Sequence, residues 1–172
     1  VVPPASIATA SLQQVARRFV AEQGIQHFYQ EGVCHQVVVE KGLVQPGMLV
    51  VGGDSHTCTY GALGAFAAGV GSTDIGLAYA TGKAWFRVPE TIRVDIHGVP
   101  PCGTYAKDVI LAVVRELGVE GANYRALEFG GPTVERMSID DRLTLANMAV
   151  EMGGKAGLVE PDETTFAYLR RR

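Results

Sequence analysis

The stretch that decides the fold is MLVVGGDSHTCTY, residues 48–60. Its first four residues are apolar and are bounded by glycines, which is typical of a short buried strand in a parallel sheet. Asp54, Ser55 and His56 follow this strand directly. In open α/β sheets, ligands bind in the crevice at the carboxyl ends of the strands. We therefore expect these three side chains to lie in a candidate site.

These three residue types suit catalysis, although another interpretation has similar weight. A carboxylate beside an imidazole sets the tautomer of the ring, and a hydroxyl between them binds a substrate carboxylate or carbonyl. Alternatively, Asp54 and Ser55 cap a turn or a helix, and His56 is a surface residue. His35 follows Gly32 closely and lies among valines, where a histidine is more often structural than catalytic.

Outward from this stretch, hydrophobic periodicity predicts alternating helices and strands, which favours an α/β architecture with mainly parallel sheets. Helices are expected over residues 7–23, 72–81, 105–117, 138–152 and 162–172, and strands over 48–51, 91–97, 126–129 and 156–159. Residues 35–41 fit a strand or a helix. A strand with one polar face follows Pro89, so we expect two domains, residues 1–86 and 87–172.

The helix expected over residues 138–152 carries one polar stripe. A step of 100° per residue brings Asp140, Thr144, Asn147 and Glu151 to the same face. The ordinary interpretation is a solvated face. The alternative is a water-filled cleft, because residues 143–152 contain no Lys or Arg and two glycines follow them.

Composition excludes several classes of protein. The net charge of −3 and the lack of a basic stripe before the last three residues argue against a nucleic-acid partner. No apolar run approaches the roughly 18 residues of a membrane helix, and a hydrophobic share of 47% argues against disorder. Cys34, Cys58 and Cys102 are too widely spaced for a metal knuckle or a disulfide framework, which favours a reducing compartment and no metal site.

Several motifs together resemble the aconitase superfamily. They are GVCHQV at residues 32–37, GDSHT at 53–57, GALGA at 61–65, GVGSTD at 69–74, KDVIL at 107–111, GGP at 130–132 and NMAVE at 147–151. The form DSHTCTYG, residues 54–61, is most similar to the large (catalytic) subunits of homoaconitase and 3-isopropylmalate dehydratase. Aconitase itself has Asn at the position of Thr59.

The resemblance implies three-layer α/β domains and a [4Fe-4S]-dependent hydro-lyase, which isomerises a hydroxy-polycarboxylate by removing and re-adding water. It implies catalytic roles for Asp54, His56, His35 and Glu151, and substrate contacts for Ser55, Thr59 and Asn147. Isopropylmalate, homocitrate or homoaconitate, and citrate remain open as substrates. The complete enzyme is expected in the cytoplasm, in leucine or lysine biosynthesis, with a small subunit that carries the swivelling domain and a serine base.

The cluster cysteines of this superfamily lie in a Ser-Cys-Thr-Asn segment and a later CxxC, and neither occurs here. We therefore expect an internal fragment of the large subunit that alone binds no cluster and is inactive. Two other hypotheses remain. One is a cluster-less anion-binding or scaffold module without catalysis. The other, a mononuclear metal hydrolase on His35, Asp54 and His56, lacks a helix-borne pair of ligands.

Overall fold

The computed structural model describes residues 3–172, which divide into two compact units, residues 3–41 and 42–172. The first unit contains helices α1 (Ile7–Glu22) and α2 (Cys34–Glu40). The predicted helix α1 is confirmed, and it begins where the Ser6 hydroxyl accepts a hydrogen bond from the Thr9 amide at 3.2 Å. Residues 34–40 form a helix rather than a strand, with Val37 and Val39 buried.

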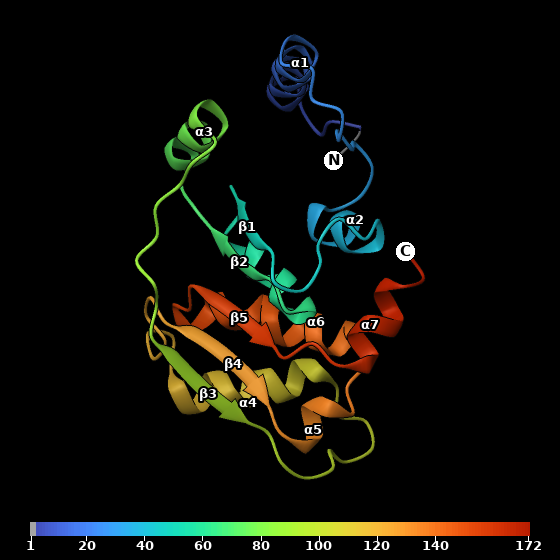
Figure 1. Cartoon of the computed structure of the whole chain (residues 1–172), viewed down its shortest axis with the longest axis vertical. Helices are drawn as coiled ribbons and strands as arrows, with labels where there is room; N and C mark the ends of the chain where they lie inside the picture. The colour runs from blue at the N-terminus through green and yellow to red at the C-terminus, as the bar shows by residue number, and fades with distance from the viewer. Residues whose placement is uncertain (1–2) are drawn as a thin grey trace. The chain divides into compact units, whose positions relative to one another are not determined.

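The second unit contains two parallel sheets (Figure 1). Strands β1 (Leu49–Gly52) and β2 (Phe66–Gly69) form the smaller sheet, and β3 (Thr91–Asp95), β4 (Ala126–Gly130) and β5 (Ala156–Val159) form the larger one, with β4 in the middle. The helices are η1 (Ser55–Leu63), α3 (Ser72–Thr81), α4 (Ala106–Leu117), α5 (Pro132–Glu135), α6 (Ile139–Asn147), η2 (Met148–Met152) and α7 (Glu163–Leu169), of which η1 and η2 are 3₁₀-helices. The predicted α/β class with parallel sheets is confirmed.

The main hydrophobic core lies between the larger sheet and helices α4 and α6. Ile110 of α4, Leu127 and Phe129 of β4, and Leu145 of α6 belong to it. Helix α6 begins with a capping box, in which Ser138 and Asp141 exchange hydrogen bonds between side chain and backbone. The helix changes to 3₁₀ geometry at Met148. Of the polar stripe predicted for residues 138–152, Glu151 therefore lies on η2 and the other members lie on α6.

The boundary predicted after residue 86 falls between the two sheets, and the assignment of two domains there stays a prediction.

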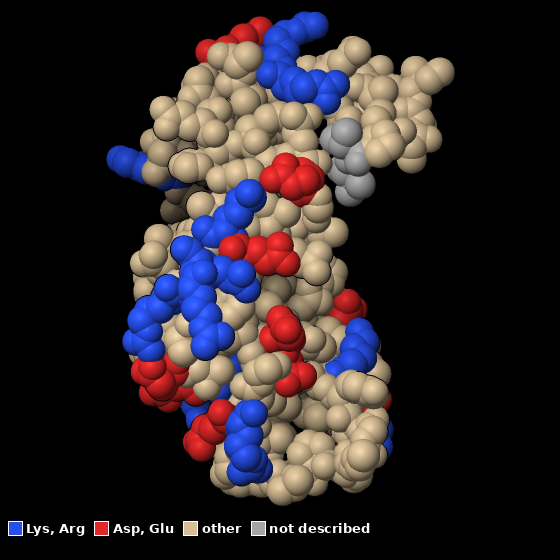
Figure 2. Space-filling model, turned by 90° about the vertical axis from the view of Figure 1, so that its right-hand side faces the viewer, with Lys and Arg blue, Asp and Glu red and all other residues tan. Residues whose placement is uncertain are grey.

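Basic and acidic side chains stand next to one another on the face shown in Figure 2, so neither sign covers that face. Among residues 3–172, no helix combines the length and the hydropathy that crossing a membrane requires.

A buried ion pair joins α6 to the start of α7. Both terminal nitrogens of the fully buried Arg142 guanidinium donate to the Asp162 carboxylate, at 2.8 and 2.7 Å. The same carboxylate caps α7 by accepting from the Thr165 amide at 3.1 Å. The hydrogen bonds from Arg142, followed by that from Thr165, hold the pKa of Asp162 below its usual value of 3.8.

This ion pair is expected to make stability depend on acid pH. Because the pKa of Asp162 is lower in the folded chain than in the unfolded chain, its contribution to stability is present above the ordinary value of 3.8. The contribution is lost as the pH falls through the lowered folded value. Urea unfolding at a series of pH values should show this loss below about pH 4. An Asp162→Asn variant, which lacks the titrating carboxyl, should lose less stability over that range; equal losses would contradict the assignment.

Candidate functional site

The predicted crevice residues lie where β1 passes into η1. Asp54 is the N-cap of η1, and its Oδ1 accepts a hydrogen bond from the His56 amide at 2.7 Å. The Thr57 hydroxyl donates to the Asp54 carbonyl at 2.6 Å. These bonds fix a tight turn. Asp54 therefore caps η1, as the alternative interpretation of the sequence predicts, and the same residue also lies in the candidate site.

His56 lies between two carboxylates. Its Nε2 is 3.4 Å from Oε1 of Glu151, which lies 95 positions further along the chain, and its Nδ1 is 3.6 Å from Oδ1 of Asp54. The Ser55 hydroxyl is 3.3 Å from the same Nδ1. About a third of the His56 side chain, 36%, remains exposed. A small molecule can therefore reach an imidazole whose two nitrogens both have acidic neighbours.

Buried hydrogen bonds connect the turn at His56 to the end of α6. The Thr59 hydroxyl donates to the His56 carbonyl at 2.6 Å and accepts from Nδ2 of Asn147 at 2.8 Å. Thr59 is only 5% exposed. The Thr59 hydroxyl thus donates one hydrogen bond and accepts another, and through them Thr59 connects the His56 turn to the end of α6. Its predicted contact with substrate, like that of Asn147, stays a prediction.

Gly69, at the end of β2, packs directly against the turn. A Cβ at this position would lie 2.6 Å from the Asp54 carbonyl oxygen and 2.7 Å from Cα of Ser55. Both distances are too short for a side chain, so only glycine lets β2 approach the candidate site this closely.

Cys58 contributes packing rather than reactivity. It is buried, and its thiol donates to the Asn147 carbonyl, with 3.4 Å between the sulfur and the oxygen. Burial raises the pKa of this thiol to about 11. The thiol is therefore neutral at neutral pH, and a neutral thiol is neither a good nucleophile nor a metal ligand.

Six of the seven predicted site residues lie in the second unit, and contacts connect them. These residues are Asp54, Ser55, His56, Thr59, Asn147 and Glu151. The seventh, His35, lies in the first turn of α2 in the other unit, with Nδ1 3.8 Å from the sulfur of its neighbour Cys34. Its part in the site stays a prediction.

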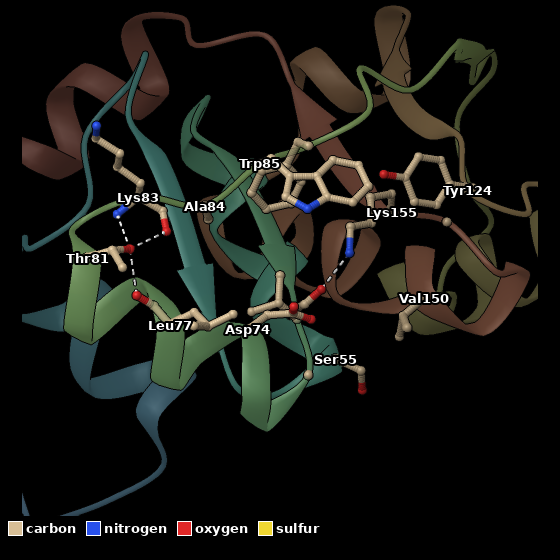
Figure 3. Close-up of a pocket in the computed structure, with 15 residues that line it drawn as sticks. Ser55, Asp74, Leu77, Thr81, Lys83, Ala84, Trp85, Tyr124, Val150 and Lys155 are labelled. Carbon is tan, nitrogen blue, oxygen red and sulfur yellow. Dashed lines mark hydrogen bonds between the residues drawn. The ribbon is translucent and has the colours of Figure 1, made fainter.

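A cavity of about 870 Å³ opens beside this cluster (Figure 3). Ser55 and Val150, the neighbours of His56 and Glu151 in the chain, belong to its wall, together with Lys155. Lys155 belongs to none of the sequence motifs described above. The one feature of the sequence that could have indicated it is the position of this lysine, directly before the short apolar strand β5 and between Gly154 and Ala156.

Residues 6–172 match the aconitase family (aconitate hydratase). This chain belongs to that family, as its motifs predict. It is 58% identical to the 3-isopropylmalate dehydratase large subunit 1 of Methanopyrus kandleri, over 99% of this chain and 41% of that protein. A probable 3-isopropylmalate dehydratase large subunit of Methanothermobacter thermautotrophicus is 60% identical with the same coverage. A probable methanogen homoaconitase large subunit of that organism is 53% identical, over 99% of this chain and 40% of that protein.

The chain spans about two fifths of the length of these curated relatives. Its cysteines do not fit the ligand set of an iron–sulfur cluster, which needs several converging thiolates. Cys58 is buried and protonated, whereas Cys34 and Cys102 are exposed and lie in different units. Within residues 3–172, no three His, Cys, Asp or Glu side chains are grouped so as to hold a metal ion.

Proposed function

We propose that this chain forms one wall of the active site of a hydro-lyase large subunit. The proposed reaction removes water from a hydroxy-polycarboxylate and adds it back with the hydroxyl on the neighbouring carbon. The observation that carries the proposal is the placement of His56 between Glu151, at 3.4 Å, and Asp54, at 3.6 Å. Membership of the aconitase family and the dehydratase and homoaconitase names of the relatives support it.

The role proposed for His56 is that of an acid toward the leaving hydroxyl. Loss of water requires a proton on the departing oxygen and a base that takes a proton from the adjacent carbon. A protonated imidazole supplies the first proton, and the carboxylates of Glu151 and Asp54 stabilise its positive charge. Re-addition of water returns that proton to His56. The base for the carbon-bound proton is expected on the small subunit, outside this chain.

Each remaining part of the proposal follows from the family. A [4Fe-4S] cluster is expected in the complete enzyme, held by cysteines outside this chain. The name "large subunit" of the relatives supports a small-subunit partner. Leucine or lysine biosynthesis and a cytoplasmic location belong to the same proposal. Isopropylmalate and homoaconitate are both supported as substrates, because relatives of both names are more than 50% identical to this chain.

Turnover by the complete protein tests this proposal. The large subunit containing this chain would be produced with its small subunit, and the cluster would be reconstituted. The unsaturated acid formed by dehydration absorbs ultraviolet light, so its appearance can be followed with isopropylmalate, homocitrate and citrate. Turnover of at least one hydroxy-polycarboxylate is expected. Absence of turnover with all three, in a preparation that contains the cluster, would overturn the proposal and favour a binding module.

A further inference from the structure

Lys155 connects the two sheets of the second unit beside the candidate site. It lies directly before β5, four positions after Glu151, and its amide donates to the Arg125 carbonyl at 2.8 Å. Its ammonium donates to the carbonyl of Gly69, at the end of β2, at 2.6 Å (Figure 3). The backbone of Lys155 is therefore fixed beside the larger sheet, while its side chain binds the smaller sheet.

The hydrogen bond from Lys155 continues through the backbone to the strand that precedes the Asp54 turn. The Gly69 carbonyl and the Val70 amide belong to one peptide group, and this amide donates to the Gly52 carbonyl at 2.9 Å. Hydrogen bonds in such a chain polarise one another, and a charged donor strengthens the first of them. One ammonium thus acts on the end of β2 and, through it, on the end of β1.

Close packing carries the same restraint to the site. The backbone of Gly69 approaches Asp54 and Ser55 so closely that no side chain fits between them. A movement of Gly69 must therefore displace the Asp54–Ser55 backbone or open a gap beside it, and both are costly in a packed interior. His56 follows directly in the chain. Lys155 thus restrains the turn that carries the His56 imidazole.

The surroundings of the Lys155 side chain strengthen its bond to the backbone. The residue is partly buried, and its Nζ lies 5.6 Å from the ring centre of Phe86 and 5.9 Å from that of Tyr124. These rings stabilise the ammonium charge and exclude part of the water that would compete for it. A hydrogen bond is stronger where less water surrounds it. The side chain is therefore part of the packed structure, unlike a mobile surface lysine.

We propose that Lys155 is a positioning residue, which sets the separation of His56 and Glu151. Glu151 lies on η2, just before Lys155 in the chain, whereas His56 lies on η1. The 3.4 Å contact between their side chains requires these two segments to lie close together. The Lys155–Gly69 bond holds the segment after η2 to the backbone that packs on the η1 turn. The proposal deepens the hydro-lyase assignment and rests on it for the catalytic role of His56.

The imidazole resonances of the 172-residue chain test this geometry without turnover. The sequence contains four histidines, so three serve as internal references for His56, whose signal is assigned with His56→Ala. Lys155→Met keeps the length and apolar stem of the side chain but removes the ammonium. At constant pH, it should shift the His56 resonance more than the other three. Lys107→Met removes a charge from the exposed start of α4 and should leave the His56 resonance in place.

Kinetics of the complete enzyme test the functional consequence. Lys155→Met should lower kcat by roughly 10- to 100-fold, because a catalytic group misplaced by about 1 Å can cost about 10²-fold. Combined with Glu151→Gln, the same change should cost much less, since the contact that Lys155 positions is already weakened. A lysine needed only for folding would cost the same in both backgrounds. Lys155→Arg keeps a charged donor for the Gly69 carbonyl and should recover most of the activity.

Three results would overturn the proposal. They are an unmoved His56 resonance in Lys155→Met, an equal loss of kcat with and without Glu151→Gln, and no more activity in Lys155→Arg than in Lys155→Met. Failure of the hydro-lyase assignment gives a different result, in which the His56 resonance moves but the unaltered complete enzyme converts none of the three acids. That result would support the restraint by Lys155 and contradict the hydro-lyase assignment alone.

Discussion

His56→Ala in the complete large subunit, assembled with its small subunit, is expected to lower kcat by roughly 10²- to 10⁴-fold, the usual contribution of a positioned acid or base. The reason is the loss of the imidazole that stands 3.4 Å from Glu151 and 3.6 Å from Asp54. The visible absorbance of the cluster should not change, because His56 is not proposed as an iron ligand. Steady-state kinetics and absorbance spectra of the same preparations provide the two measurements.

Two further variants make this result interpretable. Glu151→Gln keeps the size of the side chain but removes the negative charge beside Nε2, and should lower kcat less than His56→Ala while leaving folding normal. His97→Ala changes an exposed histidine just beyond β3 and should leave kcat unaltered. Loss of the cluster spectrum in His56→Ala, or full activity in it, would contradict the role assigned to this residue.

Gly61→Ala is expected to destabilise the second unit by about 3 kcal/mol or more, at the upper end of overpacking effects. A Cβ at Gly61 would lie 1.7 Å from the carbonyl oxygen of Gly157 and 2.8 Å from its carbonyl carbon. Both are backbone atoms, so no flexible side chain can move aside. The clash would push η1 away from β5, and with it the turn that carries His56.

Gly76 offers a matched control for this change. It lies inside α3, and a Cβ there would meet no atom within 4 Å. Gly76→Ala should therefore stabilise the chain by roughly 0.5–1 kcal/mol, the difference in helix propensity between the two residues. Urea unfolding curves of both variants give the comparison. Similar midpoints for Gly61→Ala and the unmodified chain would show that η1 and β5 do not pack as described.

Patterns within single segments of the sequence predicted much of the fold but less of the candidate site. The strand before Asp54, the alternating strand β3 and the capped helix α6 were all predictable, because each depends on periodicity or capping within one segment. β2 was not predicted, since its core positions are Ala67 and Ala68, small residues without strand character. η1 is absent from the helices expected from the sequence, because hydroxyl side chains dominate its first turns and show no helical periodicity.

The candidate site combines segments that no local pattern connects. Asn147 and Glu151 could be placed on one face of a helix, but the residues alone favoured a solvated face over a cleft. Their contacts with Thr59 and His56 cross 88 and 95 positions of sequence. Only tertiary packing determines such contacts. The motif resemblance predicted the same residues without predicting that Thr59 is buried.

The burial of Cys58 also matters for chemical labelling. Thiol reagents react with the thiolate, and a pKa of about 11 keeps this thiol protonated at neutral pH. Cys34 and Cys102 are exposed, and one lies in each compact unit. Spin labels on the unaltered sequence would therefore attach at these two positions. The distance between the labels would then report how the two units are arranged in solution.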